Sequence, residues 1–98
     1  MVLSINAYAY SENLECLDIN DSSLNYSVQQ IGQSNKYFLT ITKGRKVIYS
    51  ETLEYFDWQG EAEYSGPYSS IINNGEEYIE FIHNSSKLKS TQLKCEDL

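Results

Sequence analysis

Residues 36–49 read Lys-Tyr-Phe-Leu-Thr-Ile-Thr-Lys-Gly-Arg-Lys-Val-Ile-Tyr, and this stretch decides the class of fold. The part from 36 to 42 is apolar on both faces and rich in aromatic and β-branched side chains, which predicts a central β-strand. The turn at 43–46 contains Gly44, a residue that adopts the positive φ of tight turns without steric cost. Since the strand pattern resumes at 47–49, the stretch predicts a β-hairpin.

The flanking sequence repeats this pattern of short strands and turns. Apolar and polar residues alternate over 3–9 and 24–28, as in strands with one buried face. An Asn-Gly pair within 73–75 predicts a type I′ turn between strands at 70–72 and 78–82.

A last turn at 84–87 leads into a weak strand around 88–95. The chain therefore predicts about seven or eight short strands, an all-β or mostly β fold arranged as an antiparallel sandwich, a barrel or a curved meander. At most one or two short helices fit this pattern, at 11–17 and at 51–58.

Length and composition predict one domain over residues 1–98. A chain of 98 residues with 41% hydrophobic residues is long enough for one modest core and too apolar for disorder. The expected core residues are Ile5, Leu39, Ile41, Ile48, Ile79 and Phe81.

Acidic and aromatic residues are concentrated between Val47 and Ser86, where Lys and Arg are absent. This block holds eight carboxylates and eight aromatic side chains, and the rest of the chain is close to neutral, so the block accounts for the formal charge of −7 of the whole chain. A surface of one sign attracts a basic partner, and Tyr and Trp anchor many protein interfaces. The alternative is that the acidity serves solubility alone.

Composition also indicates where the protein acts. A pI near 4.5 argues against direct binding of nucleic acid or of an anionic membrane, because like charges repel. The first residues lack the basic and apolar regions of a secretory signal, so the expected location is the cytoplasm. In a reducing cytoplasm Cys16 and Cys95 are expected as small buried thiols, and a disulfide between them is the alternative for an exported protein.

The residues that carry chemistry are sparse. His83 is the only histidine, and no second histidine, zinc-type Cys/His cluster or Gly-x-Ser-x-Gly turn accompanies it. The segment Asp18–Ser22 begins like a calcium loop, but the Gly at the sixth position and the Glu ligand at the twelfth position of an EF-hand are absent, so it predicts an Asx-type turn. We therefore expect no enzymatic activity, no metal and no cofactor.

The sequence favours a binding protein, in which carboxylates at strand spacing meet Lys and Arg on a basic partner and aromatic side chains hold the complex together. The predicted contact residues are Glu51, Glu54, Tyr55, Asp57, Trp58, Glu61, Glu63 and Tyr64. Carboxylates at this spacing would mimic the phosphates of a nucleic acid, so the protein would fit a groove that normally binds phosphates. The prediction is an inhibitor of a nuclease or related effector, as a toxin immunity protein or a phage anti-defence (anti-CRISPR) protein.

Two other classes stay open. One is a non-enzymatic structural or assembly module whose acidic surface keeps it soluble. The other is a small-ligand or carbohydrate-binding β-domain that uses Trp58 and tyrosines as stacking platforms.

Overall fold

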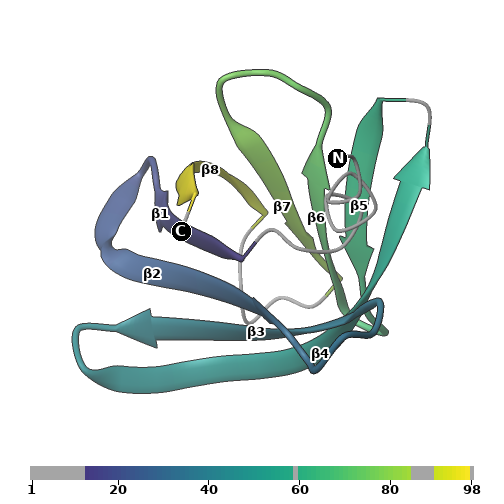
Figure 1. The fold of residues 1–98 in the computed structure, drawn as a ribbon. Coiled ribbons are helices and arrows are strands. Elements are labelled where there is room, and N and C mark those ends of the chain that lie inside the picture. The colour runs from purple at the N-terminus through teal and green to yellow at the C-terminus, as the bar shows by residue number, and fades with distance from the viewer. Residues whose placement is uncertain (1–12, 59, 85–89, 98) are drawn as a thin grey trace.

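The computed structural model describes residues 13–58, 60–84 and 90–97, and over these ranges the protein is an all-β barrel (Figure 1). Its strands are β1 (Leu14–Asp18), β2 (Asp21–Gln30), β3 (Lys36–Lys43), β4 (Lys46–Trp58), β5 (Glu61–Ser65), β6 (Ser69–Asn73), β7 (Ile79–His83) and β8 (Thr91–Asp97). Each strand pairs antiparallel with its neighbours along the chain, and β8 pairs with β1 to close the barrel. The predicted antiparallel β-domain is confirmed, and of the three architectures considered it is the barrel.

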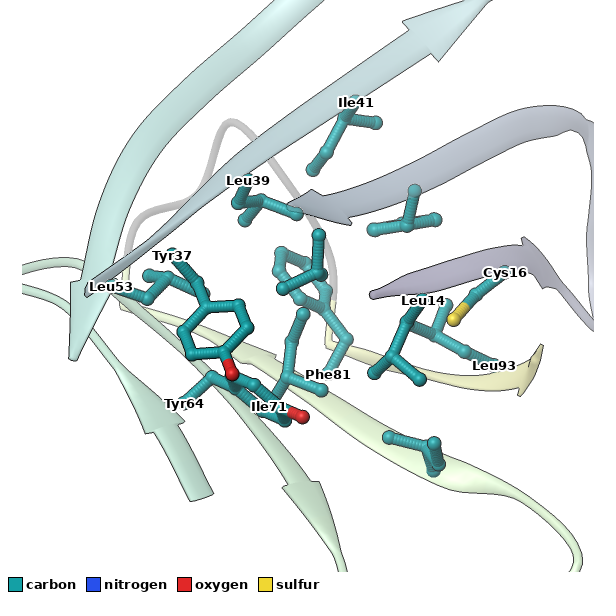
Figure 2. Close-up of a cluster of buried hydrophobic side chains, with 13 residues drawn as sticks. Leu14, Cys16, Tyr37, Leu39, Ile41, Leu53, Tyr64, Ile71, Phe81 and Leu93 are labelled. Carbon is teal, nitrogen blue, oxygen red and sulfur yellow. The ribbon is translucent and has the colours of Figure 1, made fainter. Parts of the chain in front are cut away.

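The strands have one buried and one outer face. Along β3, Tyr37, Leu39 and Ile41 are buried in the interior, whereas Phe38 on the outer face is 42% exposed. The predicted central strand is confirmed, since β3 pairs with β2 and with β4, but its outer face is not covered, because a single-layer barrel covers only the inner face. Figure 2 shows the interior cluster. Its buried members are Leu14, Cys16, Tyr26, Val28, Tyr37, Leu39, Ile41, Leu53, Tyr64, Ile71, Ile79, Phe81 and Leu93.

Four of the predicted core residues are confirmed, namely Leu39, Ile41, Ile79 and Phe81. Ile5 and the strand predicted at 3–9 lie outside the described residues. The prediction of Ile48 as a core residue was wrong, since its side chain is 40% exposed. On β4, Tyr49 and Val47 pair with successive residues of β3. Ile48 between them is the extra residue of a β-bulge, and a bulge breaks the alternation on which the prediction relied.

The predicted hairpins are present. β3 ends at Lys43 and β4 begins at Lys46, with Gly44 at φ 62° in the turn. The second hairpin joins β6 to β7, but its loop runs from 74 to 78 and is longer than the predicted type I′ turn. The side chain of Asn73 shapes this loop instead, because its Oδ1 accepts a hydrogen bond from the Gly75 N–H at 3.0 Å. Of the turn predicted at 84–87 only residue 84 is described, and the last predicted strand corresponds to β8.

The described parts of the two segments that allowed short helices are both strands, in β1 and β4. Their helical signals were weak, and pairing with neighbouring strands overrides such local preferences. The Asx-type turn predicted at Asp18–Ser22 is confirmed. The Asp18 carboxylate accepts hydrogen bonds from the Asn20 N–H at 2.7 Å and from the Thr91 hydroxyl at 2.9 Å.

The two cysteines form a disulfide where the barrel closes. Cys16 of β1 lies directly opposite Cys95 of β8, and their sulfur atoms are bonded. The expectation of two separate buried thiols was therefore wrong. No local signal in the sequence points to this disulfide, because the two cysteines are far apart in the chain and only closure of the barrel brings β1 and β8 together.

Candidate partner-binding face

Strand alternation divides the predicted contact residues between the two faces of β4 and β5. Glu54 and Phe56 lie on the outer face of β4, whereas Tyr55 between them faces the interior. On β5, Glu63 is paired with Phe56 and therefore shares the outer face with it. Glu61, two residues earlier, lies on the same face. The structure thus brings together three of the five predicted carboxylates.

A row of paired residues continues this outer surface over the neighbouring strands. The row consists of Phe56 (β4), Glu63 (β5), Ile72 (β6) and Glu80 (β7). Phe56 is 38% exposed and Ile72 is half-buried, so acidic and apolar side chains alternate across the row. We call this surface the acidic face and define it by Glu54, Phe56, Glu61, Glu63, Ile72 and Glu80.

Cations are sparse at this surface. Lys36 of β3 lies at its border and forms an ion pair with Glu54, with 3.4 Å between Nζ and Oε1. The Asn35 side-chain amide also donates to Glu54 at 3.1 Å. Glu54 is therefore already partly neutralised, whereas Glu63 and Glu80 lie on strands that contain no Lys or Arg.

Glu51 does not belong to this surface. It is paired with the buried Leu39 and therefore faces the interior. Its carboxylate accepts hydrogen bonds from the Tyr49 hydroxyl at 3.0 Å, the Tyr68 N–H at 3.0 Å and the Ser69 hydroxyl. Glu51 thus holds the connection between β5 and β6 against β4, so its carboxylate stabilises the fold.

Two predicted aromatic contacts are also interior residues. Tyr64 is 3% exposed, and its ring centroid lies 5.0 Å from that of Tyr37 and 5.1 Å from that of Tyr55. These rings fill one part of the barrel, as Figure 2 shows for Tyr37 and Tyr64. In this conformation Tyr64 offers no surface to a partner.

The other two predicted residues lie near the end of β4. Asp57 is exposed and pairs with Ala62, which places it on the opposite side of the strand from Phe56. The backbone of Trp58 pairs with Glu61 at the end of the same strand pair. Phe56, Ile72 and Glu80 were not among the predicted contacts. Reading 51–58 as a strand would have found Phe56, because strand alternation separates it from Tyr55.

Another polar cluster lies inside the barrel around Tyr49. The Tyr49 ring packs edge-on against His83, with 4.9 Å between centroids, and its hydroxyl reaches Glu51. Burial raises the pKa of Tyr49, its hydrogen bond with Ser69 lowers it, and the contact with Glu51 raises it again. In the described ranges no group of three or more His, Cys, Asp or Glu residues is placed to hold a metal ion, at this cluster or elsewhere.

Among the hollows lined by described residues, two are shallow and lie on the outside of the barrel. One of about 680 Å³ is lined by Leu17, Ile19 and Tyr78 together with polar residues of β1, β2 and β8. The other, of about 360 Å³, borders the acidic face at Glu54 and Phe56.

The described residues form no apolar helix of membrane-spanning length. No protein-family model, curated protein or solved structure matches the chain significantly.

Proposed function

We propose that this protein is a non-enzymatic binding protein whose acidic face docks on a basic protein partner. One observation carries the proposal, namely the alternation of carboxylates with Phe56 and Ile72 across β4 to β7 on a surface poor in cations. Carboxylates speed and orient the encounter with a positive surface, and apolar anchors slow dissociation.

The partner class that fits best is a nuclease or another nucleic-acid-binding effector. Such proteins carry Lys and Arg in a groove for phosphates, and a rigid barrel presents carboxylates to that groove without an ordering cost. The protein would then act as an inhibitor, either as a toxin immunity protein or as a phage anti-defence (anti-CRISPR) protein. A cytoplasmic site of action requires in addition that the barrel stay folded when the disulfide is reduced.

The first experiment is capture of the partner from the native host or its competitor, followed by binding kinetics with the purified partner. The double variant Glu63→Lys/Glu80→Lys should slow association markedly, and added salt should weaken wild-type binding steeply. The matched control is Glu15→Lys/Glu96→Lys, an outer pair facing each other across β1 and β8. It makes the same charge change away from the acidic face and should bind as wild type does.

The apolar anchors are tested separately. Phe56→Ala should cost on the order of 2 kcal/mol of binding energy through faster dissociation. Phe38→Ala removes a similarly exposed ring on the outer face of β3 and serves as its control. Trp58→Ala, read on folded protein, tests the remaining predicted anchor and should have an effect of similar size. Wild-type affinity in both Phe56→Ala and the acidic double variant would refute the proposed face.

The other classes give different results. Open-ended self-association without a basic partner would indicate an assembly module. Salt-insensitive binding of a small ligand, abolished by Leu17→Arg in the larger hollow, would indicate a ligand-binding domain.

A further inference from the structure

The loop that joins β6 to β7 contains the only Asn-Gly pair of the sequence, at Asn74–Gly75. Figure 1 shows this loop at the top of the view, beyond the ends of both strands. Both residues are exposed, and so are Glu76 and Glu77 after them, so water reaches the pair freely. Glycine has no Cβ atom, so its backbone nitrogen is less hindered than that of any other residue when it meets the side chain of a preceding asparagine.

The side chain of Asn74 is held in a position that favours attack by the next backbone nitrogen. Its Oδ1 accepts a hydrogen bond from the Glu76 N–H at 3.3 Å. This bond folds the side-chain amide back over the main chain of the two following residues instead of into solvent. The same N–H stabilises negative charge on Oδ1, which is the atom that becomes negative when a nucleophile adds to Cγ.

We propose that Asn74 is a modification site, at which the chain converts its own asparagine to aspartate and isoaspartate through a cyclic imide. The Gly75 nitrogen gives up its proton to solvent and attacks Asn74 Cγ, so a C–N bond forms. The Cγ–Nδ2 bond then breaks, and Nδ2 takes up a proton and leaves as ammonia. Water opens the imide at either of its carbonyl carbons, which gives aspartate or isoaspartate. The net reaction consumes one water molecule and releases one ammonia molecule, and no oxidant or cofactor takes part.

The same loop contains a brake on this reaction. The Gly75 N–H, whose proton must be removed, donates a hydrogen bond to Asn73 Oδ1 at 3.0 Å. The nitrogen can attack only when this bond opens. Because the bond is exposed to water, the need to open it slows the reaction by about two- to tenfold and does not block it.

The other asparagines of the described ranges lack this combination. All of them are followed by a residue with a Cβ atom, which hinders the attacking nitrogen. Three of them also donate side-chain hydrogen bonds to other segments of the barrel, namely Asn20, Asn25 and Asn35. Asn74 should therefore react first.

The modification adds a negative charge next to the acidic face. The loop connects β6 and β7, which contribute Ile72 and Glu80 to that face. Each modified molecule has a formal charge one unit more negative than the −7 of the sequence. Isoaspartate in addition lengthens the main chain of the loop by one methylene group.

The test is incubation of the purified protein at physiological temperature and pH, followed over time by peptide mass spectrometry. The peptide that contains Asn74 should gain about 1 Da before any other asparagine changes, and fragmentation should find both aspartate and isoaspartate at position 74. In water enriched in oxygen-18, the new carboxylate should carry the label. Asn74→Gln should abolish the change, because its longer side chain must close a larger and less favourable ring. Asn84→Gln, at another exposed asparagine, is the matched control and should leave the rate at position 74 unchanged.

A further variant tests the brake. Asn73→Ala removes the acceptor of the Gly75 N–H and should speed the modification by about two- to tenfold. Circular dichroism confirms that each sample stays folded during the incubation. An Asn74 that stays unmodified, aspartate without isoaspartate, an earlier change at another asparagine, or a rate that Asn73→Ala does not raise would overturn the proposal. The measurement uses the protein alone, so its outcome does not depend on the proposed basic partner.

Discussion

Cys16 on β1 is the direct cross-strand partner of Cys95 on β8, and the disulfide between them spans the line along which the barrel closes. The two residues are 79 positions apart in sequence, so the bond encloses most of the chain. The first and last described strands are therefore held by a covalent link as well as by backbone pairing.

Loss of this disulfide should lower stability substantially. For a loop of 79 residues the chain-entropy argument gives about 4.5 kcal/mol. In urea unfolding, the double variant Cys16→Ser/Cys95→Ser should have a free energy of unfolding roughly 2–5 kcal/mol lower than that of the oxidised wild type. The wild type with its disulfide reduced should show a similar loss. Equal stability of the oxidised wild type and the double variant would contradict this expectation.

Glu51 and Glu54 lie on the same strand and should respond differently to truncation. Glu51→Ala removes the acceptor of three hydrogen bonds, from Tyr49, Tyr68 and Ser69, and should cost about 2–3 kcal/mol of unfolding free energy. Glu54→Ala loses a partly exposed ion pair and should cost less than about 1 kcal/mol. Similar losses in the two variants, measured by denaturant unfolding, would argue against the structural role of Glu51.

Gly66 should not accept a larger residue. A Cβ atom there would lie 2.8 Å from Leu53 Cδ2 and 2.9 Å from Glu51 Cδ, closer than van der Waals contact allows. Gly66→Ala should therefore lower the melting temperature and cost about 1–3 kcal/mol. Pro67→Ala changes the exposed next residue and should cost less than about 1 kcal/mol. A Gly66→Ala protein as stable as the wild type would show that the contact relaxes freely.

Tyr26 should limit stability at alkaline pH. Burial raises the pKa of its hydroxyl to about 12, and the negative charges of Asp18 and Asp21 act in the same direction. The unfolded chain releases this proton near pH 10, which is roughly the ordinary value. Between about pH 10 and 12 the folded protein retains a proton that the unfolded chain has lost, so stability present below this window falls as pH rises through it.

Relative to its own value at neutral pH, the wild type should lose about 2–3 kcal/mol over this window through Tyr26. The variant Tyr26→Phe should lose less unfolding free energy over the same pH range, because it lacks this hydroxyl. Tyr68→Phe, which removes the hydroxyl of an exposed ring, is the control. Identical pH profiles of Tyr26→Phe and the wild type would refute the assignment.

Features set by neighbouring residues were predictable from sequence. The alternation in 36–42 and the Gly44 turn predicted a hairpin that the structure contains, because strand period and turn preference depend on adjacent residues. The same holds for the Asx turn at Asp18, whose carboxylate caps a backbone N–H two residues away. Glu61 and Glu63, two residues apart on β5, share the outer face for the same reason.

The remaining features depend on which strands pair, and only the tertiary structure decided them. The bulge at Ile48 is a mismatch between two strands, so its exposure is invisible in either strand alone. Glu51 and Glu54 are chemically identical, but pairing with Leu39 turns one carboxylate inward and leaves the other at the surface. Cys16 meets Cys95 because the barrel closes. Strand alternation is a local property of the backbone. The register of the strands and the closure of the barrel depend instead on the free energy of the whole chain, to which residues far apart in sequence contribute.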